Sequence, residues 1–397
     1  MIFRGRTFDG KKLIENAEFK VSEETGIIEY VEETRNSTRM ANGKELSDKD
    51  VTFLPGLIDT HIHFFGTGNH SLNDWVLTDK VIVTIRSVED SKNLLNAGFT
   101  TVRTMGDKVS IAMSKAERMN LLYGPRIISA GFSLAETGGN DDPRNFDLDF
   151  AQKISYSYYC DSPWECRRAV RMNLRDGAES IKAYSSTSFA GGGQIKNQLT
   201  LEELSAIADE SHKGLVKAAS HAYGESAISN SVLAGFDSVE HGLGLTEKLA
   251  EEMKKRGTFY VPTMSTYVRS KNSGNSTKDA IIKRHLEKEV QLASDDKIKI
   301  AVGTDFVGSS DDPHGTNYKE IALISSVTGP EVALQSGTSI AAECIGLKNV
   351  GSIFKGYQAD VIAVKGNPMT NIDVIGPDNV LFVMKGGKIQ KNRLLKK

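Results

Sequence analysis

Val51-Thr-Phe-Leu-Pro-Gly-Leu-Ile-Asp-Thr-His-Ile-His63 is the stretch of sequence that decides the fold. Its apolar residues lack helical spacing, so the run predicts a buried strand that ends at the two histidines. In an extended strand, side chains two residues apart point to the same side, roughly 6–7 Å apart at the backbone. His61 and His63 therefore direct two imidazoles toward one point, which is half of a metal site.

Helical and strand-like segments alternate from about residue 53 to about residue 355. The segment Leu201–Lys213 follows Thr200, with Glu203 three residues later, and this capping box predicts a helix start. About eight strand–helix steps in one continuous region favour an α/β fold, a closed (β/α)8 TIM barrel, over an open doubly wound sheet. We interpret Gly191–Gly193 as a flexible loop rather than a phosphate cradle, because no strand immediately precedes it.

The two ends of the chain both resemble short strands separated by turns. Neither end carries enough apolar residues for a core of its own, so we expect them to pair into one small composite β-sandwich domain. The predicted divisions are 1–52 for the N-terminal part of this domain, 53–355 for the barrel and 356–397 for the C-terminal part.

Composition narrows the class of protein. The 397 residues are 39% hydrophobic and 25% charged, which is ordinary for a globular enzyme, and the net charge of -2 predicts no nucleic-acid partner and no membrane surface. The three cysteines contain no C-x-x-C pair, so we expect no disulfide framework and a reducing compartment. The first residues lack the apolar segment of a signal peptide, and the expected location is cytoplasmic.

Four further residues stand at the ends of predicted barrel strands: Lys182, His221, His241 and Asp305. The carboxyl ends of barrel strands carry catalytic groups, because eight loops converge there over a rigid scaffold. Each residue alone has an ordinary alternative, such as a satisfied histidine, a lysine that reaches solvent or an aspartate that caps a helix. Together with His61 and His63, these residues place six such side chains on one rim of the barrel. The ordinary alternatives would require all six to gather there by chance, which is improbable.

The chain resembles the amidohydrolase superfamily, whose metal-site signature matches the six residues in order and spacing. It is most similar to the branch with Xaa-Pro dipeptidases and related amino-acyl carboxypeptidases, and imidazolonepropionases are more distant relatives. The matching stretches are Leu54–His63, Gly98–Arg103, Gly124–Arg126, Arg175–Lys182, Ser238–His241, Gly303–Asp305 and Ala359–Val361. The likeness runs from about residue 50 to the end of the chain.

The resemblance implies two divalent metal ions, with Zn²⁺ expected. One would be held by His61, His63 and Asp305 and the other by His221 and His241, with Lys182, carboxylated by CO₂, bridging both. It also implies a metal-bridging hydroxide that attacks an amide carbonyl, while Asp305 moves the proton to the leaving nitrogen. Tyr223 would hydrogen-bond the substrate. Relatives are often homo-oligomers, so we expect one here.

The pocket loops depart from the relatives. Many relatives have Thr-Gly-Gly-His-Gly-Asp where this chain has Thr137-Gly-Gly-Asn-Asp-Asp142, so Asn140 offers a non-titrating amide where a substrate-facing imidazole is expected. His314, in the loop after the last barrel strand, is a further candidate substrate contact. Arg103 is expected to form a structural ion pair.

We therefore expect a metal-dependent hydrolase of small molecules that cleaves the amide bond of a dipeptide or N-acyl amino acid. A cyclic-amide hydrolase of the imidazolonepropionase type is the alternative, although such relatives lack the bridging lysine. A non-catalytic scaffold of the same superfamily is a remote alternative, because all six ligand positions are intact.

Overall fold

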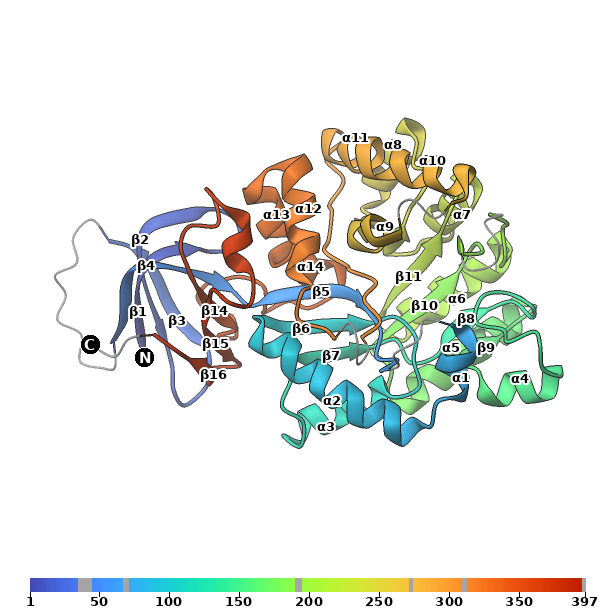
Figure 1. Ribbon diagram of the computed structural model, residues 1–397, viewed down its shortest axis with the longest axis horizontal. Coiled ribbons are helices and arrows are strands. Elements are labelled where there is room, and N and C mark those ends of the chain that lie inside the picture. Colours follow the sequence, from blue (N-terminus) through green and yellow to red (C-terminus); the bar gives the residue numbers. More distant parts are fainter. Residues whose placement is uncertain (35–44, 67–70, 190–194, 271–273, 309–312, 395–397) are drawn as a thin grey trace.

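The computed structural model describes residues 1–34, 45–66, 71–189, 195–270, 274–308 and 313–394, so the loop at Gly191–Gly193 lies outside the described residues. Within these ranges, parallel strands and helices form one body, and a seven-stranded sheet projects from it (Figure 1). The chain is thus an α/β protein, as the alternation of segments predicts.

The body contains two parallel sheets, ordered β5-β6-β7 and β13-β12-β11-β10-β8-β9. Their strands are β5 (Leu57–Ile62), β6 (Phe99–Thr104), β7 (Arg126–Ser129), β8 (Ser133–Ala135), β9 (Ser157–Tyr159), β10 (Ser180–Tyr184), β11 (Lys217–Ala222), β12 (Ser238–His241) and β13 (Phe259–Val261). Residues 300–306 lie between the two sheets: the amide of Thr60 donates to Val302 O (2.8 Å) and that of Ala301 donates to Tyr260 O (2.9 Å). On the other side, the amide of Glu179 donates to Ser129 O (2.8 Å).

Helices surround these strands (Figure 1). They are α1 (Leu72–Leu77), α2 (Lys80–Asn96), α3 (Ser110–Arg118), α4 (Leu148–Ile154), α5 (Pro163–Asp176), α6 (Leu201–Lys213), α7 (Glu225–Ala234), α8 (Glu247–Arg256), α9 (Met264–Ser270), α10 (Ser276–Arg284), the π-helix η2 (His285–Glu289), α11 (Val290–Asp295), α12 (Tyr318–Thr328), α13 (Pro330–Ser336) and α14 (Ser339–Cys344). The predicted capping box of α6 is confirmed, since the amide of Thr200 donates to Glu203 (2.8 Å) and that of Glu203 to Thr200 Oγ1 (3.3 Å).

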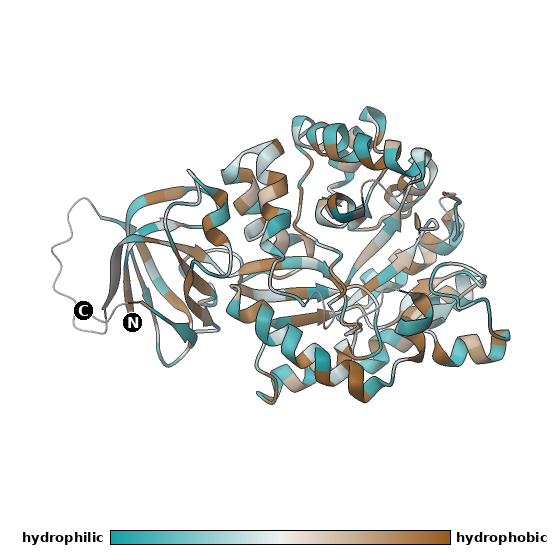
Figure 2. Cartoon of the chain, in the orientation of Figure 1, coloured by the Kyte–Doolittle hydropathy of each residue, from teal (hydrophilic) through white to brown (hydrophobic). Residues whose placement is uncertain are grey.

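Apolar and polar stretches alternate along the helices that surround the strands (Figure 2). Helix α8 shows the pattern: Leu249, Ala250 and Met253 are buried against the body, while the last turn, from Lys254 to Arg256, is basic and exposed. Burial of one face holds such a helix on the strands, and lysine or arginine in the last turn also suits the negative end of its dipole.

The seven-stranded sheet is built from both ends of the chain, in the order β16-β15-β14-β4-β1-β2-β3. Its strands are β1 (Ile2–Phe8), β2 (Leu13–Val21), β3 (Ile28–Glu33), β4 (Glu45–Pro55), β14 (Val361–Lys365), β15 (Val380–Lys385) and β16 (Lys388–Asn392), and the 3-10 helix η3 (Ile372–Ile375) lies between β14 and β15. Phe3 stacks on Phe19 at 4.7 Å and meets the edges of Phe53 and Phe382 at 5.5 and 5.7 Å. Both termini therefore share one aromatic core.

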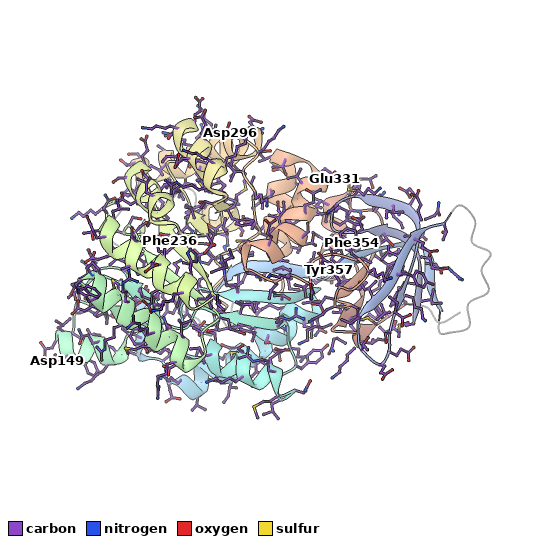
Figure 3. The ribbon with its side chains drawn as sticks, turned by 180° about the vertical axis from the view of Figure 1, so that it is seen from behind. Asp149, Phe236, Asp296, Glu331, Phe354 and Tyr357 are labelled. Atoms are coloured by element: carbon purple, nitrogen blue, oxygen red, sulfur yellow. A yellow bond between two sulfur atoms is a disulfide. The ribbon has the colours of Figure 1, made fainter. Side chains whose placement is uncertain are left out.

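The chain returns from the helices to this sheet through a short segment that contains Phe354 and Tyr357, both visible at the border of the two parts (Figure 3). The amide of Ile28 donates to Tyr357 O (2.9 Å), and the amide of Gly356 donates to Ile28 O (2.8 Å). This pairing joins the start of the C-terminal part to β3, at the border between the sheet and the body.

Cys160 and Cys166 form a disulfide, which corrects the expectation that the cysteines carry none. Cys160 follows β9 and Cys166 lies near the start of α5, and the turn at Ser162 brings their Cα atoms to 5.0 Å, within the span of a disulfide. Cys344 is free and buried. Because disulfides persist in oxidising compartments, the cysteines no longer favour a reducing one.

Among the helices in the described part of the chain, none has the length and apolar content needed to cross a bilayer. The cytoplasmic location and the homo-oligomer stay predictions.

Replacing Phe382 with alanine should destabilise the protein by about 3–5 kcal/mol, because it removes the C-terminal ring from the shared core. Phe150, on the surface of α4 and 46% exposed, gives the matched control, for which alanine should change the free energy of unfolding by less than about 0.5 kcal/mol. Urea unfolding of both variants measures the difference, and equal effects would refute the shared core.

Candidate active site

One cavity of about 550 Å³ collects the six predicted ligand residues. His61 and Lys182 lie on β5 and β10, and His221 and His241 lie on β11 and β12. His63 directly follows β5, and Asp305 lies between the isolated bridges of Ile300 and Phe306. The described residues that line the cavity are His61, His63, Phe65, Ser71, Leu72, Trp75, Gly139, Asn140, Asp141, Asp142, Arg144, Tyr156, Lys182, Tyr184, Ser188, His221, Tyr223, His241, Asp305 and Val307. The carboxyl ends of the parallel strands thus converge on one space.

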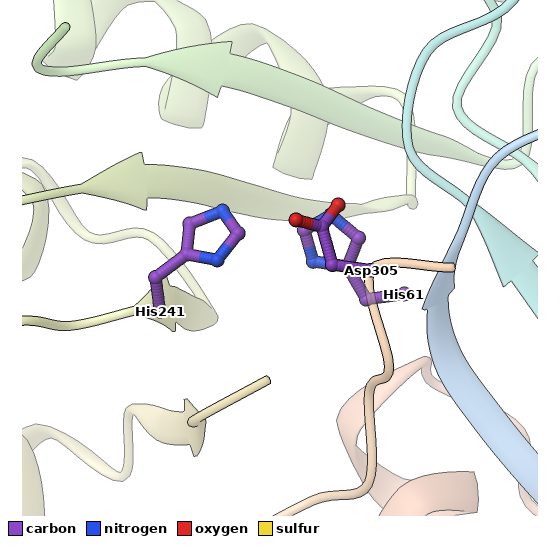
Figure 4. Close-up of side chains that lie close together, drawn as sticks. All are labelled: His61, His241 and Asp305. Carbon is purple, nitrogen blue, oxygen red and sulfur yellow. The ribbon is translucent and has the colours of Figure 1, made fainter. Parts of the chain in front are cut away.

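His61, His241 and Asp305 face one another across the centre of this cavity (Figure 4). One ligand atom from each lies within 4.8 Å of the others, and Oδ1 of Asp305 is 3.2 Å from Nε2 of both His61 and His63. Nε2 of His61 is buried and makes no hydrogen bond of good geometry with the described residues. A cation bound between the buried nitrogen lone pair and the carboxylate oxygen would satisfy both atoms.

The outer nitrogens of three histidines are already engaged. Nδ1 of His61 lies 2.8 Å from Glu240 Oε2, that of His63 lies 3.0 Å from Gly106 O, and that of His241 lies 2.8 Å from Thr263 Oγ1. A proton on Nδ1 leaves the lone pair on Nε2, directed into the cavity. These contacts fix the rings in the tautomer that binds a metal.

The pKa shifts of His221, His241 and Asp305 favour the charge states that a metal site requires. Burial holds the pKa of His221 and of His241 well below the usual value, so both rings are neutral and have a lone pair to donate. Burial alone would raise the pKa of Asp305, but the neighbouring histidines, His61 first, hold it well below its usual range. The carboxylate is therefore ionised.

Lys182 is 1% exposed, and its ammonium lies 5.2 Å above the ring of Tyr184. It forms no ion pair with the described residues, and burial lowers its pKa to about 8. A neutral amine is the form of lysine that reacts with CO₂, so the environment of Lys182 suits carboxylation.

A buried ion pair between Arg103 and Glu240 holds the ring of His61 in position. Arg103 donates to Glu240 Oε1 (2.8 Å) and to Thr60 O (2.7 Å), while the other carboxylate oxygen of Glu240 holds His61. Burial alone would raise the pKa of Glu240, but Arg103 and then His61 lower it to about 2. The structural ion pair predicted for Arg103 is confirmed, and its partner is the residue before His241.

Asp59, on β5, joins this strand to the segment around Thr304 by hydrogen bonds. Its carboxylate accepts hydrogen bonds from Thr304 Oγ1 (2.8 Å), Asn317 Nδ2 (2.9 Å) and the amide of His61 (3.1 Å). Burial raises its pKa to about 6. These bonds fix the backbone on both sides of the contact between His61 and Asp305.

The profile of the amidohydrolase family matches residues 52–390 of the chain. The chain belongs to this family. A curated relative, the ochratoxinase of Aspergillus niger, is 30% identical over 371 residues, which cover 85% of this chain and 75% of that protein.

Solved structures agree with this assignment. The crystal structure of A. niger ochratoxinase superposes with a TM-score of 0.90 at 26% identity, over 98% of this chain and 96% of that one. A Xaa-Pro dipeptidase with methionine bound in its active site gives a TM-score of 0.85 at 29% identity, over 98% and 99% of the two chains. The predicted similarity to the dipeptidase branch of the amidohydrolases is thereby confirmed, and the chain is a hydrolase of amide bonds.

Two of the predicted substrate contacts, Asn140 and His314, differ in their positions. Asn140 lines the cavity, and its amide donates to Ser186 O (3.1 Å) and accepts from the amide of Ser188 (3.2 Å), so it connects one pocket loop to another. His314 is not among the described lining residues. It is 2% exposed, and its Nε2 lies 3.0 Å from His63 O, so it supports the backbone of His63.

Tyr223, in contrast, lines the cavity beside two ligands. Its ring stacks on His221 at 4.5 Å and meets the edge of His241 at 5.3 Å. The hydroxyl lies 2.7 Å from that of Tyr267, and burial raises its pKa, so it stays protonated and able to donate. The position suits the substrate hydrogen bond expected for it.

Sequence reasoning missed three polar groups that organise the amidohydrolase site: Asp59, Asp141 and Glu240. Asp141 accepts from Tyr156 OH (2.8 Å), Ser157 Oγ (2.9 Å) and Ser133 Oγ (3.0 Å). The available signal was a carboxylate inside a predicted buried strand, as at Asp59 and Glu240, because such a group requires a buried partner.

Replacing Glu240 with glutamine should weaken metal retention by roughly 10–100-fold, because the ring of His61 loses its charged partner. Glu252→Gln, on the exposed side of α8 beside Arg256, provides the control and should bind metal as the unmodified protein does. Metal content after dialysis against graded chelator measures the effect on the folded fraction. Equal retention in both variants would show that Glu240 has only a structural role.

Proposed function

We propose that this chain is a binuclear, metal-dependent amidohydrolase that cleaves the amide bond of a dipeptide or N-acyl amino acid. The observation that carries the proposal is the convergence of six ligand-type side chains on one cavity, with the atoms of His61, His241 and Asp305 within 4.8 Å of one another. The Nε2 of His61, which has no hydrogen-bond partner among the described residues, and the lowered pKa of Lys182 support a fit to the divalent metals that the family generally uses.

In the proposed assignment, His61, His63 and Asp305 hold one Zn²⁺ and His221 and His241 hold the other. Addition of the Lys182 amine to CO₂ with release of a proton would give a carbamate, whose single negative charge is shared by two oxygens that could both act as metal ligands. An unmodified ammonium has no lone pair to donate and would repel both cations. The buried, unpaired position of Lys182 supports this conversion.

Bound divalent metals would lower the pKa of a water into the neutral range and polarise the scissile carbonyl. The chain's own residues then move the proton and orient the substrate. Asp305, ionised among the histidines, accepts a proton from the attacking water and passes it to the leaving nitrogen. Tyr223, protonated beside His221, donates a hydrogen bond to the bound substrate.

We also propose that β5, β6, β7, β10, β11, β12, β13 and residues 300–306 close into a (β/α)8 barrel within residues 53–355. The hydrogen bonds Thr60–Val302, Ala301–Tyr260 and Glu179–Ser129 support closure on both sides of the two sheets. The segments 1–52 and 356–397 would form a separate β-sandwich domain around the core of Phe3, Phe53 and Phe382.

Protein loaded with zinc and bicarbonate should release free amine from a subset of dipeptides and N-acyl amino acids. Asp305→Asn should lower turnover by at least about 100-fold and leave the fold intact, because the amide cannot take the proton. Asp295→Asn, on exposed α11, is the matched control and should keep full activity. Amine release across the panel measures both. Silence with metal bound would favour cyclic amides instead, and an active Asp305→Asn would contradict the proton transfer.

Lys182→Ala should lose the carbamate and bind fewer metal ions per chain than the unmodified protein, since the bridging oxygens are gone. Isotopically labelled bicarbonate followed by carbon NMR detects the carbamate, and elemental analysis gives the metal count. Lys254→Ala, at the exposed end of α8, should change neither. A carbamate signal that persists in Lys182→Ala, or a count near one metal in the unmodified protein, would overturn the bridging role.

A further inference from the structure

One wall of the cavity is an aromatic stack that the proposed chemistry does not use. The ring of Phe65 stacks on the ligand His63 at 4.8 Å, and Trp75 stacks on the other side of Phe65 at 4.5 Å. Tyr156 packs against Phe65 at 5.0 Å, and all four rings line the cavity. The stack therefore extends from a metal ligand outward to α1.

The rings of Phe65 and Tyr156 in this wall are buried, and the ring of Trp75 is partly exposed. Phe65 and Tyr156 are 5% and 2% exposed, whereas Trp75 is only partly buried. The hydroxyl of Tyr156 donates to Asp141 Oδ1 (2.8 Å), and Asp141 is held in turn by Ser133 and Ser157. A rigid apolar wall pays little conformational entropy when a ligand packs on it.

The remaining apolar groups at this wall are aliphatic. Leu72 and Val307 line the same cavity and belong to the same small cluster as Phe65, Trp75 and Tyr156. The same cavity also has polar lining residues, among them Asn140 and Ser188, which are hydrogen-bonded to each other. Because Phe65 already stacks on His63 and on Trp75, the part of this wall left for a bound molecule is the partly exposed ring of Trp75, with Phe65 and Tyr156 buried behind it.

We propose that the rings of Phe65, Trp75 and Tyr156 form a binding subsite for a flat aromatic group of the substrate. The inference rests on the proposed function and narrows it to dipeptides and N-acyl amino acids that carry an aromatic ring. Stacked rings interact favourably beyond the contribution of buried area, so an aromatic substrate gains over a saturated one of the same size.

Matched substrates that differ only in phenyl against cyclohexyl test the preference in the zinc- and bicarbonate-loaded enzyme. The unmodified enzyme should hydrolyse the phenyl member with the higher kcat/KM, and Trp75→Leu should reduce that ratio by about 3- to 10-fold, the size expected for one ring pair. Trp75→Phe keeps a ring and should retain most of the preference. Trp164→Leu, which removes a tryptophan that is 79% exposed on α5, should leave the ratio unchanged.

A binding measurement separates this subsite from catalysis. The chain has two tryptophans, so Trp164→Phe leaves Trp75 as the single reporter of tryptophan fluorescence. Titration of the loaded variant with phenylalanine, which has no amide bond to cleave, should change the emission at several-fold lower concentration than cyclohexylalanine does.

The outcomes distinguish the two proposals. Tighter binding of the aromatic compound without hydrolysis of any amide would overturn the proposed function and keep the subsite. Hydrolysis without preference for the phenyl substrate, together with equal fluorescence titrations, would overturn the subsite and keep the proposed function.

Discussion

A single buried carboxylate, that of Glu240, holds together the part of the molecule on which the site depends. It binds the guanidinium of Arg103 on one side and the ring of His61 on the other. Since Arg103 also donates to Thr60 O, the strand that carries the two histidines is fixed relative to β12, which carries His241. Leaving one member of a buried ion pair without its partner costs about 3–5 kcal/mol, so this group constrains the ends of β5, β6 and β12 together.

The backbone at the site is strained at three residues, and hydrogen bonds hold these residues in place. Three residues have positive φ angles, in the left-handed region that residues other than glycine rarely adopt: His241 (67°), Thr263 (48°) and Asp305 (53°). Each such residue costs about 1–3 kcal/mol. The amide of Asp305 donates to His61 O (2.8 Å), and Thr263 holds the ring of His241 (2.8 Å). The sharp turns direct consecutive strand ends into one cavity, and the surrounding hydrogen bonds keep them there.

The convergence of the six candidate ligand residues on one cavity was predictable because each follows from a local pattern, a polar side chain at the end of a strand-like run. Their supports were not, because they depend on contacts between distant segments: Glu240 and His61 are 179 positions apart, and Asn317 and Asp59 are 258 apart. His314 shows the same limit, since its loop was identified correctly but its direction was not. The disulfide of Cys160 depends on the turn before α5, which spacing alone does not reveal.

The loop from Thr137 to Asp142 links the pocket loops to the aromatic wall. The side-chain amide of Asn140 donates to Ser186 O (3.1 Å) and accepts from the amide of Ser188 (3.2 Å). Asp141 has a φ of 65°, and its carboxylate accepts a hydrogen bond from Tyr156 OH (2.8 Å). Asn140 thus holds two loops together, and its neighbour positions a ring of the aromatic wall. In the proposed function, that wall and Tyr223 contact the substrate, so a change in this loop would alter selectivity through the position of Tyr156.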